Sequence, residues 1–207
     1  FSIRDEVGHW MVLSHKVWPV LTVSFVLGLI DSTFWTTGTV FSSQLAKENW
    51  WGGMFLSFYM LPPLFMGLIM SRLKIVSGKK KIAEITLFLA GIVLIFLGMQ
   101  SSITWILVSV LVMAVLLTVT QPMTDAVYTD ILSRMGRERI HMTGLSNSMI
   151  SLAYIVGPIL AGWFASVWGE KMTFGGVGWL MVFVSVFLLL VTPKKIHLPQ
   201  EEIQSWE

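Results

Sequence analysis

An aspartate inside a long apolar run is the residue best suited to chemistry in this sequence. Asp31 lies 14 residues after Val17, where the run begins, a rise of about 21 Å along a helix. Carboxylates at membrane depth are costly and are functional by default. Because removal from water disfavours the charged form, Asp31 is able to take up and release a proton. The alternative is a fixed hydrogen-bonded or ionic link that never titrates.

The helical face around Asp31 suits a cavity or a close helix contact. Residues at helical spacing on this face are small or polar, with Trp35 as the one large side chain. They are Ser24, Gly28, Asp31, Trp35, Gly38 and Ser42.

A second polar stripe follows in the fourth apolar run, where Thr118, Gln121, Asp125 and Tyr128 are separated by steps of three, four and three. Gln121 and Tyr128 both donate and accept hydrogen bonds, which suits a hydroxylated or amide-bearing substrate. Asp125 lies about 12 Å from the end of its helix, so simple hydration is the alternative for this carboxylate.

The fifth run carries a face of small residues that favours close helix packing. Gly157 and Pro158 add a place where the helix can bend, so a gating motion is a further possibility. Asn147 and Tyr154 lie on the same face and are secondary candidates for the cavity. The full set is Gly144, Asn147, Ser151, Tyr154, Pro158 and Gly162.

Other chemistries find no support in the residues. There is no cysteine, and the four histidines, His9, His15, His141 and His197, are not clustered, so we expect no metal site and no cofactor. The motifs H-E-x-x-H, G-x-S-x-G and the P-loop are absent, which argues against an enzyme and against ATP-driven pumping. A net charge of +2 is too small to suggest nucleic acid.

The elements that position these residues are membrane helices. The chain is 55% hydrophobic and 13% charged, against roughly 25% charged in soluble domains, so its solvent must be lipid. A helix needs roughly 20 apolar residues to cross a bilayer. The sequence therefore predicts an all-α bundle over 17–192, between a cytoplasmic linker (1–16) and a cytoplasmic tail (193–207). The predicted spans are 17–41, 51–70, 82–99, 103–132, 143–167 and 174–191.

Basic residues predict the orientation. If both ends of the segment are cytoplasmic, twelve of the fourteen lysines and arginines lie on the inside, and only Lys47 and Lys171 lie outside. This distribution obeys the positive-inside rule and requires an even number of spans. We expect a multi-pass protein of the plasma (inner) membrane.

The six spans are of three types by composition, and the three types occur twice in the same order. The first and fourth are polar, the second and fifth are broken by proline, and the third and sixth are almost purely apolar. Because each triplet has three spans, the second enters the membrane from the opposite side. The pattern predicts two inverted three-helix repeats, which are typical of secondary transporters.

Two motifs and the opening segment resemble the C-terminal six-helix half of the major facilitator superfamily. The loop after the second span contains Gly67, Arg72 and Gly78, similar to the family signature G-x-L-a-D-R-x-G-R-K. Ser71 replaces the aspartate, and five residues instead of one separate Arg72 from Gly78. AYIVGPILAG, residues 153–162, resembles the Gly-Pro pattern of the eleventh helix. The first 21 residues are similar to the linker that enters the seventh helix.

The resemblance implies that the first helix of each triplet lines a central cavity, the second faces the other half, and the third is peripheral. It also implies a function, secondary active transport by alternating access. We expect a small organic solute, proton coupling and export, with an N-terminal six-helix half and membrane lipid as partners. The alternatives are uptake of a sugar or another nutrient, and a six-helix module that binds partners without transport.

Overall fold

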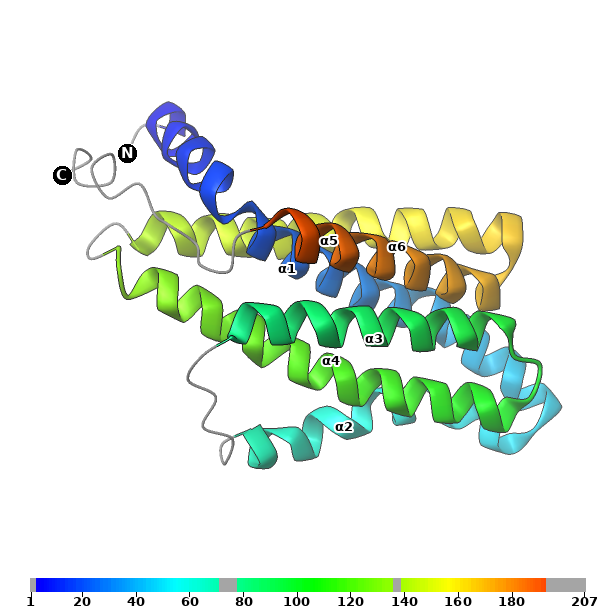
Figure 1. Cartoon of the computed structure of the whole chain (residues 1–207). Coiled ribbons are helices and arrows are strands. Elements are labelled where there is room, and N and C mark those ends of the chain that lie inside the picture. Colours follow the sequence, from blue (N-terminus) through cyan, green and yellow to red (C-terminus); the bar gives the residue numbers. More distant parts are fainter. Residues whose placement is uncertain (1–2, 71–77, 136–138, 193–207) are drawn as a thin grey trace.

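The computed structural model describes residues 3–70, 78–135 and 139–192, and every element in them is helical. Figure 1 shows the helices packed side by side in one elongated bundle. They are α1 (Ile3–Glu48), η1 (Trp50–Met54), α2 (Phe55–Met70), α3 (Lys79–Met99), α4 (Ile103–Leu132), α5 (Arg139–Trp168) and α6 (Glu170–Val191).

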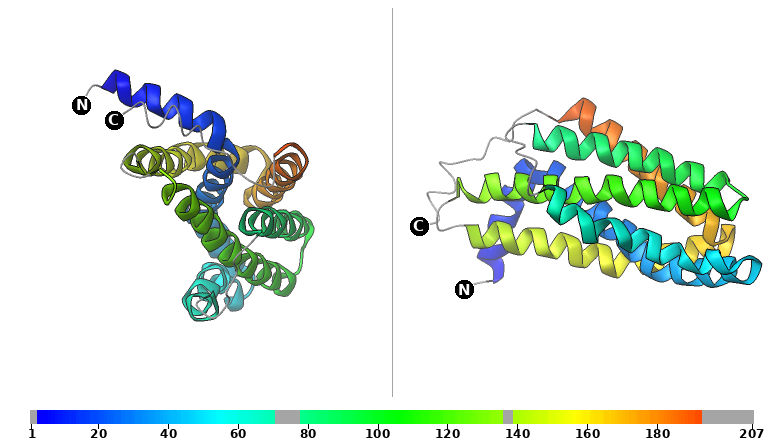
Figure 2. Two further views of the ribbon diagram at one scale, coloured as in Figure 1. Left: turned by 60° about the vertical axis from the view of Figure 1, so that its left-hand side comes forward. Right: turned by 90° about the horizontal axis from the view of Figure 1, so that it is seen from below.

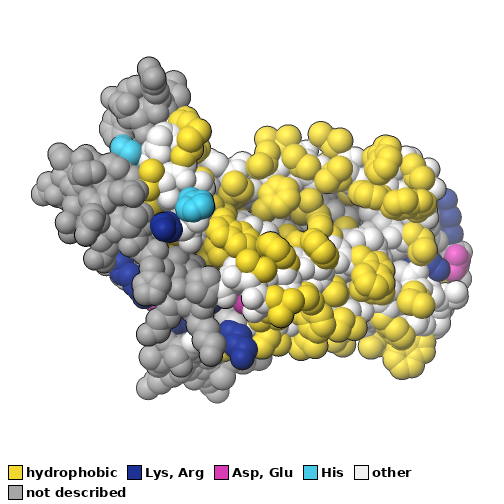
Figure 3. All heavy atoms as spheres, turned by 45° about the horizontal axis from the view of Figure 1, so that its top comes forward, with side chains coloured by type: hydrophobic (Ala, Val, Ile, Leu, Met, Phe, Trp, Pro, Cys, Tyr) yellow, Lys and Arg dark blue, Asp and Glu magenta, His cyan; other side chains and the backbone are white. Residues whose placement is uncertain are grey.

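The bundle has the dimensions and surface of a membrane-spanning one. Five of the described helices, α1, α3, α4, α5 and α6, are long and apolar enough to cross a bilayer. The sixth, α2, has 16 residues and continues from η1. Apolar side chains cover the face drawn in Figure 3, and charged side chains gather at its two ends. Five of the six predicted spans fall within these five helices, and the span predicted at 51–70 covers part of η1 and all of α2.

The first helix is longer than its predicted span and occupies the middle of the bundle. It is continuous from Ile3, so the segment predicted as a linker is helical, and it bends near Pro19 (Figure 1). Proline lacks an amide hydrogen and its ring displaces the preceding turn, which produces such bends. Seen close to end-on, α1 is surrounded by the other helices (Figure 2). In the most apolar 18-residue stretch of α1, 72% of the residues are buried; in the corresponding stretch of α5, 17% are buried.

A seam of glycines joins α3 to α6. A Cβ added at Gly91 would lie 2.9 Å from the carbonyl oxygen of Gly178, and one added at Gly98 would lie 2.8 Å from Gly175 Cα. Only glycine allows two backbones to approach this closely, and such contacts drive helix association where lipid removes the hydrophobic effect. The two spans predicted as almost purely apolar therefore pack tightly on each other, and a smaller share of α5 than of either is buried.

Buried aromatic rings fix α2 against the middle of α1. Phe34, Phe55 and Phe174 are fully buried, and they bring together α1, α2 and α6. Tyr59 stacks on Phe34 with ring centroids 4.2 Å apart and planes 8° apart. This stack sets the direction in which the Tyr59 hydroxyl points.

The two triplets make related contacts, since α1 packs along α5 and α4 packs along α2. Also, α1 begins and α6 ends at the same end of the bundle (Figure 1), as an even number of spans requires. The inverted symmetry of the two triplets stays a prediction.

Candidate functional site

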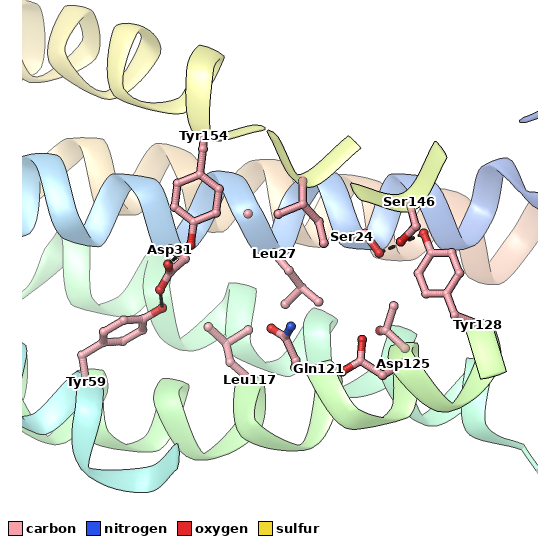
Figure 4. A pocket seen from close by; sticks show the side chains of 13 residues that line it. Ser24, Leu27, Asp31, Tyr59, Leu117, Gln121, Asp125, Tyr128, Ser146 and Tyr154 are labelled. Carbon is pink, nitrogen blue, oxygen red and sulfur yellow. Dashed lines mark hydrogen bonds between the residues drawn. The ribbon is translucent and has the colours of Figure 1, made fainter. Parts of the chain in front are cut away.

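A cavity of about 230 Å³ lies between α1, α2, α4 and α5 (Figure 4). Five of the side chains predicted from the sequence line it: Asp31, Gln121, Asp125, Tyr128 and Tyr154. The polar stripes of α1 and α4 therefore face the same space. The other lining residues are Ser24, Leu27, Gly28, Tyr59, Leu117, Thr124, Ser146 and Ile150.

Asp31 is held between two tyrosines from different helices. The Tyr59 hydroxyl on α2 donates a hydrogen bond of 2.7 Å to Asp31 Oδ1. The Tyr154 hydroxyl on α5 donates to Asp31 Oδ2, so the carboxylate lies between the two rings (Figure 4). Hydrogen bonds to an ionised acceptor are stronger than neutral ones. This tyrosine clamp, Tyr59–Asp31–Tyr154, connects α1 to both α2 and α5.

A second hydroxyl cluster lies at the other end of the cavity. Ser24 donates a hydrogen bond of 3.1 Å to the Tyr128 hydroxyl, and Ser146 is a further hydrogen-bond partner of Tyr128 (Figure 4). Tyr128 is only 8% exposed and belongs to an apolar cluster with Leu21 and Leu145. These contacts connect α1, α4 and α5 at a second level of the bundle.

Gln121 and Asp125 differ from the other polar lining residues because their side chains form no hydrogen bond with the residues that the structure describes. Both point from α4 toward the cavity (Figure 4) and are exposed. Within residues 3–70, 78–135 and 139–192, no side chain donates a hydrogen bond to the Asp125 carboxylate. Apolar side chains of Leu27, Leu117 and Ile150 form the wall beside them. The cavity thus combines satisfied hydroxyls with an open amide and an open carboxylate.

Two predicted residues lie outside this cavity. Trp35 is 48% exposed and Asn147 is exposed, and neither lines it. Asn147 follows Ser146, which does line the cavity, and one residue rotates a helix by about 100°. Their roles as cavity residues remain predictions.

Tyr59 and Ser146 line the cavity but were not singled out in the sequence. Tyr59 is a hydroxyl in an otherwise apolar stretch, three residues before Pro62. The tyrosine hydroxyl inside this apolar run was the signal in the sequence that could have identified Tyr59 as a site residue. Its partner could not be read from the sequence because Asp31 is 28 residues away.

The residues predicted for gating or packing have different surroundings. A Cβ at Gly157 would overlap Ser32 Oγ, so glycine allows α5 to lie against α1 next to Pro158. Gly78 has φ of 76° and precedes α3, a backbone conformation that favours glycine. Nothing lies within 4 Å of a Cβ added at Gly67. Arg72 lies outside the described residues.

No group of three or more histidine, aspartate or glutamate side chains comes together within the described part of the chain.

Comparison with known proteins identifies one family. Residues 49–206 match the family model described as Major Facilitator Superfamily. No curated protein and no solved structure matches the chain. The matched region begins at the end of α1 and includes every later helix.

Proposed function

Because the chain belongs to the major facilitator superfamily, whose members are transmembrane transporters, we propose that it moves a small organic solute by alternating access, coupled to protons. The observation that carries the proposal is the tyrosine clamp on Asp31. An acid at mid-span, in a cavity between four helices, is where substrate or coupling ions bind in secondary transporters.

The clamp supplies a physical link between a proton and the helix arrangement. An ionised carboxylate only accepts hydrogen bonds, and it accepts two here, from Tyr59 and Tyr154. Protonation turns one of its oxygens into a donor. The protonated oxygen is then a weaker acceptor, so the hydrogen bond from the tyrosine at that oxygen weakens, or the tyrosine turns and accepts the new proton. Proton binding at Asp31 therefore weakens the connection of α1 to α2 or to α5 and changes the balance between conformations.

We place the partner half of the transporter against α2 and α5. Large apolar side chains on both helices are exposed, among them Leu64 at 72% and Ile159 at 68%. The clamp lies between these two helices. A second six-helix half on this side would complete the cavity around Asp31. We also propose that the protein lies in the plasma (inner) membrane, with both ends of this segment in the cytoplasm.

Export is the direction we propose. Support comes from the aromatic rings of Tyr59 and Tyr154, which line the cavity on either side of the mid-span acid and suit amphipathic compounds. A second candidate, uptake of a sugar or similar nutrient, is favoured by Gln121 and by the hydroxyls of Ser24 and Tyr128 in the same cavity.

The test is substrate-dependent proton flux by the complete protein in liposomes, with a pH-sensitive dye inside. A panel of amphipathic drugs and of sugars is added to wild type, Asp31→Asn and Asp130→Asn. Asp130 is the matched control because it lies on α4 outside the cavity and pairs with Lys79 at 2.9 Å. The Asp130 side chain is 47% exposed, and ion pairs at a surface contribute only about 0–1 kcal/mol.

We expect Asp31→Asn to bind substrate without moving protons, while Asp130→Asn behaves as wild type. Unchanged flux in Asp31→Asn would reduce Asp31 to a structural contact. Proton flux with sugars alone would favour uptake of a sugar or a similar nutrient. No flux with any compound would favour a module that binds partners without transport.

A further inference from the structure

The two carboxylates of the cavity are in opposite hydrogen-bonding states. Asp31 has both oxygens occupied by tyrosine hydroxyls. Asp125 projects toward the same cavity with no donor from the described residues, and its side chain is exposed. Asp125 can accept a ligand's donor at either oxygen, whereas each Asp31 oxygen already accepts a tyrosine hydroxyl.

The residues that the structure describes give the cavity no positive charge. Its thirteen lining residues include two aspartates and no lysine, arginine or histidine. On α4, Asp130 pairs with Lys79 of α3, and Asp130 is not among the lining residues. A carboxylate at membrane depth needs a compensating charge or donor. A cationic ligand would supply that charge.

Size and the neighbouring side chains restrict the ligand further. A cavity of about 230 Å³ lies below the range of roughly 300–1,000 Å³ that is common for ligand pockets, which favours a compact molecule. Gln121 lies one helical turn from Asp125 and offers both a donor and an acceptor. Leu27, Leu117 and Ile150 give the apolar body of a ligand a surface to contact.

We propose that Asp125 is the specificity-determining residue of this cavity and that it selects a compact organic ammonium ion, whose charged nitrogen contacts the Asp125 carboxylate while its apolar body lies against Leu27, Leu117 and Ile150. Asp31 acts separately, through its tyrosine clamp. The inference rests on the proposed transport function and names the substrate class of the same site.

The experiment compares two probes that share a skeleton and differ in charge, 2-phenylethylammonium and 2-phenylethanol. Binding of each to the complete protein in detergent is measured by isothermal titration calorimetry, with protein-free micelles as the blank. The variants are Asp125→Asn, which keeps the shape and removes the charge, and Asp125→Glu, which keeps the charge. Asp130→Asn controls for the loss of one negative charge elsewhere on α4.

We expect the ammonium probe to bind wild type, Asp125→Glu and Asp130→Asn, and to weaken by about tenfold or more in Asp125→Asn, as the loss of a charge-assisted contact predicts. The alcohol should bind weakly and equally in all four proteins. An equal loss of both probes in Asp125→Asn would overturn the proposal, because it would indicate a change of shape. Ammonium binding that is unchanged in Asp125→Asn, or absent from wild type, would also overturn it.

Failure of this inference differs from failure of the transport proposal. Proton flux driven by neutral solutes, without Asp125-dependent ammonium binding, would leave transport in place and reject the substrate class. Asp125-dependent binding without flux from any compound would support the cation site and reject transport.

Discussion

The glycine seam between α3 and α6 allows a stability prediction with an internal control. A Cβ added at Gly178 would lie 2.7 Å from Ile95 N and 2.8 Å from Gly91 O. Both are backbone atoms that cannot rotate away, so the two helices must separate. Overpacking of this kind costs roughly 1–3 kcal/mol. Replacing glycine by alanine within a helix also gains about 1 kcal/mol.

Gly176 provides the matched comparison because it lies on the same helix with nothing within 4 Å of an added Cβ. Gly176→Ala receives only the helical gain of about 1 kcal/mol. Gly178→Ala receives the same gain together with the overpacking cost, so it should range from about neutral to about 2 kcal/mol less stable than wild type. The helical gain cancels between the variants, which leaves a difference of about 1–3 kcal/mol.

The measurement is equilibrium unfolding in mixed micelles with increasing sodium dodecyl sulfate, followed by tryptophan fluorescence. The free energy of unfolding should rank Gly176→Ala above wild type and Gly178→Ala at or below it. If the two alanine variants unfold at the same detergent fraction, the close approach of α3 and α6 is not the packing that stabilises the bundle, and the reasoning is refuted.

The remaining predictions use the same unfolding measurement. Gly157→Ala should be less stable than Gly162→Ala by about 1–3 kcal/mol, because the first methyl meets α1 and the second meets nothing within 4 Å; equal stabilities would argue against the close α1–α5 contact. Tyr59→Phe removes one hydroxyl from the Asp31 carboxylate and should lower the free energy of unfolding by about 1–3 kcal/mol. A Tyr59→Phe protein as stable as wild type would mean that the clamp is not formed.

Helix existence was predictable because a membrane segment must satisfy its backbone within itself and keep an apolar surface for about 20 residues. Residues 103–132 were predicted as a span, and α4 has the same bounds. The start of α1 was less predictable, since the apolar run begins at Val17 while the helix already begins at Ile3. The repeated order of span types predicts an inverted symmetry between the two triplets, and this symmetry stays a prediction.

The candidate site was only partly accessible from the sequence. Polar side chains within apolar runs are conspicuous, so Asp31, Gln121 and Asp125 could be selected as cavity residues. Tyr59 was not selected, because a tyrosine with an unknown partner is also an ordinary core residue. Asn147 was selected for its helical face, but its neighbour Ser146 is the residue that lines the cavity.

The sequence by itself determined the membrane environment of this protein, its all-helical class and the helical faces that carry polar groups, because hydropathy and a period of 3.6 residues are local properties. Only the tertiary structure decided which groups meet. Tyr154 lies 123 residues from Asp31, and their contact depends on how closely α5 approaches α1 at Gly157. The same packing leaves the Asp125 carboxylate without a donor from the described residues. The rotation and spacing of whole helices decide which side chains form hydrogen bonds, and a local sequence pattern contains no information on either.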